Sequence, residues 1–426
     1  MDIAVLTTQL FDQPGNGGER CTERLLHALL DAGHRVHVAG RGSVPAARPA
    51  RLHMQTLGPA SQAFDNMSWL ARTAALAGAW ARGQASTVHR LGADGTATQA
   101  RRWLKSTAAG MDTLVVDHLQ VHDWVRRCGA RLPTPLLLMH NLESDGYAEQ
   151  ARHAAQAGQR ARSFVLAREA RLLRALELQA LRGARAVACL SECDAVRLRE
   201  LVRQARANVG VVVLPGYAQP ALGGPPLPAR PGGSQRRIGM LGTWTWGPNR
   251  EGLLWLLQHV WPRLRSDCEL VLAGSLPPAL TLPRGVQALG RVDDVGAFYA
   301  QVDVVAIPSH SGSGVQEKAI EAVARAPLIV ATRHALRGLA PGLPAHVHTA
   351  DDPDTFALLC AQAVAPPFEQ HHAQTQAWAT QRRQAYGSAL AQCLPKHGAK
   401  VVTAALQLQP PAQSQPTCQP TSAAGR

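Results

Sequence analysis

The 426-residue chain has no run of 18 apolar residues, and its first residues, MDIAVLTTQLF, contain neither a basic segment nor a long apolar core. We therefore expect no membrane-spanning helix and no signal peptide. The eight cysteines form no C-x-x-C pair, which is typical of free thiols in a reducing compartment rather than of a disulfide framework or a zinc site. These absences favour a cytoplasmic protein.

Lysine is scarce, because only Lys105, Lys318, Lys396 and Lys400 occur among the 44 basic residues. Against 30 acidic residues the net charge is +14, and nearly all of the excess is arginine. Arginine suits phosphate, so the charge favours polyanionic partners such as nucleic acid, an anionic membrane face or phosphorylated ligands. No helix-turn-helix, zinc finger or aromatic stacking platform is recognisable, which argues against nucleic acid.

Short, continuous apolar runs alternate with segments of helical periodicity. Such runs are typical of strands that are buried on both faces, as in parallel sheets covered by helices. Their order predicts an α/β protein with two doubly wound, Rossmann-like parallel-sheet domains. The predicted strands are residues 3–7, 35–40, 113–117, 135–140, 186–191, 211–215, 237–242, 269–274, 286–290, 302–308 and 327–332.

A segment rich in proline and glycine separates the two sets of strands and predicts an interdomain linker. Residues 43–110 have weak periodicity and carry several arginines and tryptophans, so we interpret them as an irregular helical insert in the first domain. The final stretch is of low complexity and is expected to be disordered. The predicted boundaries are a first domain at 1–210, a linker at 211–236, a second domain at 237–365 and a tail at 401–426.

Ligands of open parallel sheets bind beyond the carboxyl ends of the strands, so the loops at those ends hold the candidate residues. The first loop follows strand 3–7 and contains Gly15, Gly17 and Gly18 before a helix that carries Arg20. Glycines permit close approach of a ligand, and the helix N-terminus favours an anion. A flexible turn, with Arg20 as a solvated charge, explains the pattern equally well.

The second candidate lies at the end of strand 113–117, where Asp117 and His118 follow one another. A carboxylate beside a histidine can orient the imidazole toward a reacting group, although a surface histidine in a loop is the simpler alternative. His122 and Asp123 form the second choice for such a pair.

The third candidate is the sequence HNLESD at 140–145, where several polar groups arrive as an apolar strand ends. His140, Asn141 and Glu143 are predicted to bind a substrate, the acceptor of a transferred group. A structural turn would also tolerate this sequence.

The fourth candidate is the segment PSHSGSGVQEKAIEAVA at 308–324, where Gly312 and Gly314 precede a helix. Lys318 and Glu321 are three residues apart and so share one helix face. A helix N-terminus with a lysine can bind a diphosphate, and a nearby carboxylate can accept hydrogen bonds from a ribose. An ordinary ion pair between Lys318 and Glu321 is the alternative.

Together these segments resemble the retaining glycosyltransferases of the GT-B fold, in the large family numbered four (glycosyl transferases group 1). The similar segments are GTWTWGPNREGLLWLLQHVWPRL at 242–264, GRVDDVGAFYAQVDVVAIPS at 290–309, and GSGVQEKAIEAVARAPLIVAT at 312–332 followed by ALRGL. HNLES and the GVQ-x-K form of the third segment resemble a subgroup associated with exopolysaccharide assembly.

The resemblance implies roles for individual residues. Glu321 would match the second glutamate of the E-x7-E signature, whose first position here is Ser313, and Asn249 stands where a lysine is common, with Arg250 as a substitute. The implied catalytic residues are His118, Asp117, Lys318 and Arg20. The implied donor-binding residues are Gly17, Gly18, Gly242, Asn249, Arg250, Ser313, Gly314, Val315, Lys318 and Glu321.

The resemblance also implies the reaction, a hexosyl transfer from a UDP- or GDP-linked sugar to a glycan or polyprenyl-linked acceptor, with retention. No separate cofactor is expected. No D-x-D triplet is recognised in a loop after a strand, so no metal is expected either. A helix at about 366–400 would cross back to the first domain. A nucleotide-sugar 2-epimerase and a non-catalytic subunit of a polysaccharide assembly complex remain alternatives.

The arginine excess further predicts a peripheral contact with the inner, anionic face of the plasma membrane. The Arg- and Trp-bearing insert at 69–105 and the basic helix at 161–182 are the candidate contact segments. General solubility charge is the alternative explanation.

Overall fold

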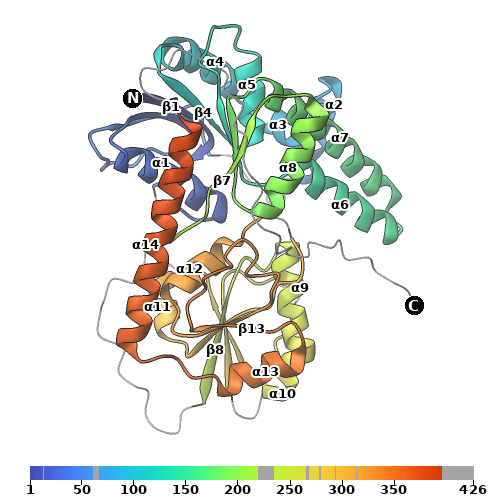
Figure 1. The fold of residues 1–426 in the computed structure, drawn as a ribbon. Helices are drawn as coiled ribbons and strands as arrows, with labels where there is room; N and C mark the ends of the chain where they lie inside the picture. The colour runs from blue at the N-terminus through green and yellow to red at the C-terminus, as the bar shows by residue number, and fades with distance from the viewer. Residues whose placement is uncertain are drawn as a thin grey trace.

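The computed structural model describes residues 1–12, 14–60, 67–218, 235–264, 268–277, 280–292, 294–312 and 314–395. They form two α/β domains, each built on one sheet (Figure 1). Every strand pair in both sheets is parallel. The predicted fold class, α/β with two Rossmann-like parallel-sheet domains, is therefore confirmed.

The first sheet has seven strands in the order β3-β2-β1-β4-β5-β6-β7. The chain reverses direction across the sheet between β1 and β4, and such a switch point is where open α/β sheets bind ligands. The strands are β1 Asp2–Leu10, β2 Arg35–Gly42, β3 Leu52–Thr56, β4 Thr113–Asp117, β5 Leu136–Met139, β6 Ala186–Cys189 and β7 Gly210–Val213.

The second sheet has six strands in the order β10-β9-β8-β11-β12-β13, with its switch point between β8 and β11. The strands are β8 Arg236–Leu241, β9 Cys268–Ala273, β10 Val286–Gly290, β11 Val304–Ile307, β12 Ile329–Ala331 and β13 Val347–Thr349.

Helices cover both faces of each sheet. Those of the first domain are α1 Gly17–Asp31, α2 Trp69–Ala81, α3 Ser86–Leu91, α4 Thr96–Ser106, α5 His122–Arg126, α6 Glu143–Gln156, α7 Arg160–Arg182 and α8 Glu192–Ala205. Those that follow are α9 Gly247–Trp255, α10 Trp261–Leu264, α11 Val295–Ala300, α12 Glu317–Arg325, α13 Pro353–Gln362 and α14 Phe368–Cys393.

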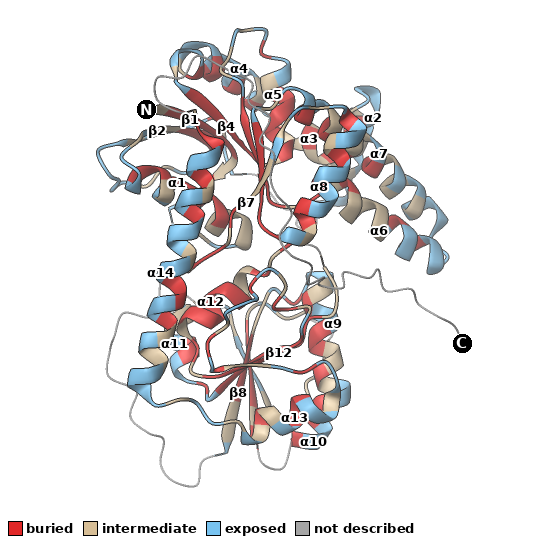
Figure 2. Ribbon diagram, in the orientation of Figure 1, coloured by how far each residue is buried: buried red, intermediate tan, exposed pale blue. Residues whose placement is uncertain are grey.

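The two faces of β1 explain the continuous apolar runs. Ala4 and Leu6 belong to one core cluster, and Ile3 and Val5 belong to another on the opposite face. Successive residues of a strand point to opposite faces, so a strand that is covered on both sides has no polar positions. Figure 2 shows the buried strands at the centre of each domain.

All eleven predicted strands are present, but two short edge strands were missed. These are β3, with the sequence LHMQT, and β13, with the sequence VHT. Both lie at the edge of a sheet and carry polar, partly exposed residues, so no continuous apolar run marks them in the sequence. The predicted helical insert at 43–110 therefore begins instead with β3 and is helical only from α2 onward.

The predicted linker needs correction at both ends. β7 at 210–213 pairs with β6, so the first domain extends past residue 210. β8 already begins at Arg236. Most of the predicted linker, residues 219–234, and the predicted tail at 401–426 lie outside the described residues.

The last described helix, α14, contributes to the cores of both domains. Trp378 and Ala379 pack in a core cluster of the second domain, and Tyr386 and Leu390 pack in one of the first. Figure 1 shows the helix running alongside α12 and then α1. Across the described ranges, no helix is both long and apolar enough to cross a membrane, and the seven cysteines there form no disulfide.

Candidate functional site

The carboxyl ends of the two sheets face each other across a cleft of about 940 Å³. Both switch points open into it, because residues that follow β1, β4, β5, β8, β10 and β11 line its walls. The predicted site residues that line it are Gly17, Gly18, Arg20, His118, His140, Asn141, Gly242, Asn249, Val315, Lys318 and Glu321.

The first wall of the cleft is the N-terminus of α1. Asn16 caps this helix, and its Oδ1 accepts a hydrogen bond from the Glu19 amide at 3.0 Å. Gly17 and Gly18 form the first turn of the helix rather than the loop before it. A Cβ on Gly17 would lie 3.1 Å from a side-chain carbon of Glu317. Glycine therefore lets the helix end approach the second domain, with its positive dipole directed at the cleft.

The opposite wall is the N-terminus of α12. Gln316 is the N-cap residue of this helix, and its side chain makes no capping hydrogen bond. The loop that precedes α12 brings the N-terminus of this helix close to the first domain. Gly314 has φ of +72°, and a Cβ there would lie 2.5 Å from Oδ1 of Asn141. Ser313, predicted to bind the donor, lies outside the described residues.

Lys318 reaches from α12 to the loop after β8. Its Nζ donates to Oδ1 of Asn249 at 2.6 Å, and Nδ2 of Asn249 donates to the carbonyl of Thr243 at 3.2 Å. The ammonium group thus occupies the place that the resemblance assigned to a basic residue at position 249. Arg250, the predicted substitute, is exposed and is not among the lining residues.

The surroundings of Lys318 disfavour its positive charge. Burial, together with the nearby Arg337 guanidinium, lowers the pKa of Lys318 to about 8. Burial also lowers the pKa of Arg337, to about 10. A desolvated ammonium group beside a helix N-terminus forms a site that an anion would stabilise.

Glu321 is held by arginines on both sides of the cleft. Its Oε1 lies 3.0 Å from Nη1 of Arg20 in α1 and 3.4 Å from Nη1 of Arg325 in α12. Lys318 and Glu321 therefore have different partners and do not form the ordinary pair considered as the alternative. The Glu321 carboxylate lines the cleft and is almost fully buried there.

A second ion pair joins the domains beneath the first. Nη2 of Arg24 in α1 lies 2.6 Å from Oε2 of Glu317 in α12, and both side chains are largely buried. Arg24 also donates from Nε to the carbonyl of Tyr217 at 2.7 Å. The Sγ of Cys21 donates to Oε1 of Glu317 at 3.0 Å. Glu317 was not singled out from the sequence.

Asp117 lies behind the cleft wall and holds the histidine that forms it. It is fully buried, and its Oδ1 is 2.6 Å from Nε2 of His140. Its Oδ2 accepts hydrogen bonds from Thr7 at 2.9 Å and Thr22 at 2.5 Å. The prediction that Asp117 contacts substrate is therefore wrong, because Thr7, Thr22 and His140 enclose its carboxylate.

His118 and His140 stack at the cleft, with ring centroids 3.7 Å apart. Burial opposes the charged form of His118, but the adjacent Asp117 outweighs it and raises the pKa of His118. Burial and the neighbouring His118 lower the pKa of His140. Burial alone would raise the pKa of Asp117, yet His118 and His140 hold it well below the usual range. The arrangement is a neutral imidazole beside a more basic one.

Two other predicted groups do not face the cleft. Glu143 is not among the lining residues, and burial raises its pKa. His122 is buried, and Asp123 binds Arg126 and Arg127 instead of a substrate. Glu143 begins α6, and His122 and Asp123 begin α5, so these residues belong to helices rather than to the loops assumed from the sequence.

Asp117, His118 and His140 also have the composition of a metal site, with potential ligand atoms within 4.8 Å of one another. The Asp117 carboxylate, however, is already occupied by hydrogen bonds from Thr7, Thr22 and His140. We interpret the cluster as a hydrogen-bonded support for the histidines.

One D-x-D triplet follows β13, a strand that the sequence did not reveal. Asp352 caps α13 by accepting from the amide of Thr355, and Asp354 pairs with Arg263 on the surface. Neither aspartate lines the cleft. The triplet is therefore a helix start. The predicted metal independence remains a prediction.

Several lining residues were not singled out from the sequence, among them Trp246 and Arg291. Trp246, half exposed, stands in the loop after β8, and a Cβ on Gly312 would lie 3.5 Å from its ring. Arg291 follows β10. Both lie inside segments quoted for the resemblance, so their position beyond a strand was the available signal.

The second domain is similar to a known protein family. Residues 235–365 match the model of the family described as Glycosyl transferases group 1. A search of curated proteins finds no match.

Among solved structures, sucrose-phosphate synthase from Thermosynechococcus elongatus has a TM-score of 0.59 and 16% identity, over 92% of this chain and 99% of that one. An α,α-trehalose-phosphate synthase (UDP-forming) from Burkholderia vietnamiensis has a TM-score of 0.57 and 14% identity, over 92% and 98%. HepE from Anabaena, solved in complex with UDP-glucose, has a TM-score of 0.54 and 15% identity, over 92% and 98%.

Proposed function

We propose that this chain, whose second domain is a glycosyl transferases group 1 domain within a GT-B fold, is a glycosyltransferase that uses a nucleoside-diphosphate sugar. The observation that carries the proposal is the anion site in the cleft. Lys318, the N-terminus of α12 and the N-terminus of α1 converge there from both domains.

The geometry suits departure of a diphosphate. As the glycosidic bond breaks, negative charge grows on the leaving oxygen, and preorganised donors stabilise it without reorganisation. Lys318 and the amides of α12 supply these donors from one side, and those of α1 from the other. Glu321, one helical turn further on, is placed to accept hydrogen bonds from the ribose once Arg20 yields its place.

His118 and His140 are the groups nearest to the reacting sugar in this proposal. They sit at the first-domain wall, and Asp117 orients His140 from behind. Asn141, which approaches Gly314, is the proposed acceptor-binding residue that bridges both walls. Transfer with retention, a glycan or polyprenyl-linked acceptor and a role in exopolysaccharide synthesis remain predictions from the resemblance.

The proposal predicts stabilisation by a nucleotide. At 100 times its dissociation constant, UDP, GDP or ADP should add about 2.7 kcal/mol to the free energy of unfolding, which a thermal-shift titration detects. Glu321→Ala and Lys318→Ala should each abolish the shift, while the exposed Arg203→Ala should retain it. If no nucleotide shifts the wild-type protein at millimolar concentration, the non-catalytic subunit becomes the better proposal. An epimerised sugar nucleotide formed without acceptor would instead indicate a 2-epimerase.

Binding is also expected to depend on pH through Lys318, whose pKa is about 8. Above this pKa the amine loses its proton and its attraction for diphosphate, so the dissociation constant should rise up to about tenfold per pH unit. Calorimetric titration between about pH 6.5 and pH 9.5 measures this. Lys318→Arg stays charged throughout and should flatten the profile. A flat wild-type profile would contradict the assignment of Lys318.

We infer in addition a peripheral contact with an anionic membrane from the cytoplasmic side. Trp69 and Leu70 of α2 are about three-quarters exposed, and Phe164 of α7 is more than half exposed. Arg168 of α7 stacks on Trp80 of α2, so arginine and aromatic side chains share one surface. Exposed aromatic residues among arginines suit an anionic interface. Flotation with anionic vesicles tests the contact.

A further inference from the structure

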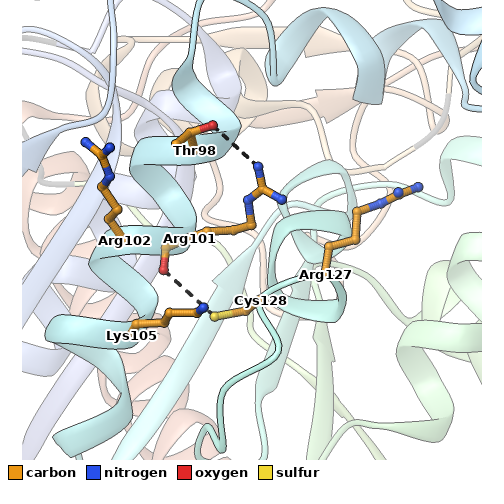
Figure 3. A pocket seen from close by; sticks show the side chains of 6 residues that line it. All are labelled: Thr98, Arg101, Arg102, Lys105, Arg127 and Cys128. Carbon is orange, nitrogen blue, oxygen red and sulfur yellow. Dashed lines mark hydrogen bonds between the residues drawn. The ribbon is translucent and has the colours of Figure 1, made fainter.

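We propose that a basic pocket between α4 and the end of α5 binds a phosphate group, at a site separate from the cleft. The pocket has a volume of about 290 Å³. It is lined by Thr98, Arg101, Arg102, Lys105, Arg127 and Cys128 (Figure 3). This inference does not depend on the proposed glycosyl transfer.

The pocket lies near the amino-terminal ends of β4 and β5 in the first sheet. α4 leads through a short turn into the start of β4, and the chain after α5 returns to the start of β5. The cleft is at the opposite, carboxyl ends of the same strands. Figure 1 shows α4 and α5 at the end of the first domain that points away from the second.

The sequence of α4 creates one half of the pocket. Ala100, Trp103 and Leu104 are buried against the core, which leaves the opposite stripe of the helix exposed. That stripe carries Thr98, Arg101, Arg102 and Lys105 in successive turns, as the 3.6-residue period requires. By itself this is an ordinary solvated helix face.

The end of α5 turns this face into a pocket. Cys128 is buried there, and its Sγ donates to the carbonyl of Arg101 at 3.9 Å, a long contact that joins the two segments. Arg127 then stands across from Arg101, as Figure 3 shows. Arg101 donates to Oγ1 of Thr98 at 3.4 Å and to the carbonyl of Ala97 at 3.2 Å, so its guanidinium is held in place.

Most of the positive charge of the pocket has no acidic partner. None of its lining residues is acidic. In the described part of the chain, no carboxylate pairs with Arg101, Arg102 or Lys105 at salt-bridge distance, whereas the exposed Arg203 and Arg383 each have one. The carboxylate nearest to Arg127, that of Asp123, is shared with Arg126. Several cations that line one concave site attract an anion.

The chemistry of the lining selects the class of anion. Arginine forks bind phosphate oxygens in pairs, and the hydroxyl of Thr98 adds a neutral donor. No aromatic ring lines the pocket, so no base can stack there. The volume is at or below the lower end of the range for drug-sized ligands. One or two phosphate groups fit this description, borne by a soluble phosphate ester or by a lipid headgroup.

Residue-resolved arginine modification tests the site in the full chain. Phenylglyoxal reacts with exposed arginines, and peptide mass spectrometry reports the rate at each. Inorganic phosphate, at ten times its dissociation constant, should slow modification of Arg101 and Arg127 about tenfold. Arg203 and Arg284, exposed elsewhere, should be unaffected when chloride matches the ionic strength. Binding of phosphate in the cleft does not alter this readout.

Vesicle flotation then distinguishes the two sources of phosphate. The variant Arg101→Ser/Arg102→Ser/Lys105→Ser is compared with Arg199→Ser/Arg203→Ser/Arg284→Ser, which loses the same charge from other exposed positions. Vesicles of phosphatidylcholine with phosphatidylglycerol are used, and thermal unfolding confirms that both variants fold.

Loss of flotation in the pocket variant alone indicates a lipid headgroup. Protection by phosphate with equal flotation of both variants indicates a soluble phosphate ester. The proposal is overturned if phosphate protects Arg101 and Arg127 no more than Arg203 and Arg284 and the two variants also float equally.

Discussion

Lys318→Met is expected to lower kcat by about 100- to 1,000-fold, the usual cost of removing one preorganised donor to a developing negative charge. The substitution keeps the length and the apolar stem of the side chain and removes only the ammonium that Asn249 holds at 2.6 Å. Steady-state kinetics with the nucleotide sugar identified by thermal shift measures the effect.

Stability should behave differently from activity at this position. Burial lowers the pKa of Lys318 to about 8, which means that the folded protein disfavours its charged form. Lys318→Met is therefore expected to unfold at the same temperature as the wild-type protein, or higher, when no ligand is present. Lys318→Arg restores the charge and should recover part of kcat. Unchanged kcat in a folded Lys318→Met protein would remove Lys318 from the mechanism.

Glu317→Leu is expected to destabilise the protein by about 3–5 kcal/mol, because it leaves the Arg24 guanidinium buried without a counter-charge. The two groups lie 2.6 Å apart between α1 and α12, with only 7% and 11% of their side-chain surfaces exposed. Burial opposes the charge on Arg24, but Glu317 more than offsets it and raises the pKa of Arg24. Urea-induced unfolding measures the loss.

The double variant Arg24→Met/Glu317→Leu supplies the decisive comparison. Replacing both partners by apolar residues leaves no buried charge, so most of the stability should return. Arg383→Met is the matched control, since Arg383 and Asp31 also join α14 to α1 at 2.6 Å but are about half exposed. An exposed pair contributes about 1 kcal/mol or less. Equal losses at the buried and exposed pairs would show that Glu317 does not hold the interface.

The fold was largely predictable from the sequence because burial on both faces leaves a direct signature. Strands such as β1 and β4 contain continuous apolar runs, at residues 3–6 and 114–116, and the helices between the strands have one apolar face. Prediction fails for strands that are not buried on both faces. β3 and β13 are edge strands with polar residues, and the end of the first domain was misplaced because β7 adjoins the proline-rich segment.

The site was predictable only in outline. Glycines, a lysine and a glutamate beyond strand ends indicated an anion site, and the structure brings Gly17, Lys318 and Glu321 to one cleft. The partners of these residues were not predictable. Arg20 and Glu321 are 301 positions apart in the chain, and Lys318 and Asn249 are 69 apart.

Asp117 and Arg250 show that the position of a residue in the sequence does not decide whether its side chain reaches the cleft. Asp117 ends β4 and Arg250 lies in the helix after β8, positions typical of site residues, yet Asp117 is enclosed behind His140 and Arg250 is exposed to solvent. Whether a side chain faces the cleft or the core depends on which helix packs over it, and that is a long-range property.

The sequence by itself determined the two parallel sheets, the loops that carry the chemistry and the cationic character of the chain, because periodicity and charge act locally. Only the tertiary structure decided which charges meet. Packing α1 against α12 brings Arg20 to Glu321 and Arg24 to Glu317, and packing α4 against the end of α5 brings Arg101 opposite Arg127. Ion pairs and anion sites act over a few ångströms, so they arise only when the chain has folded distant segments together.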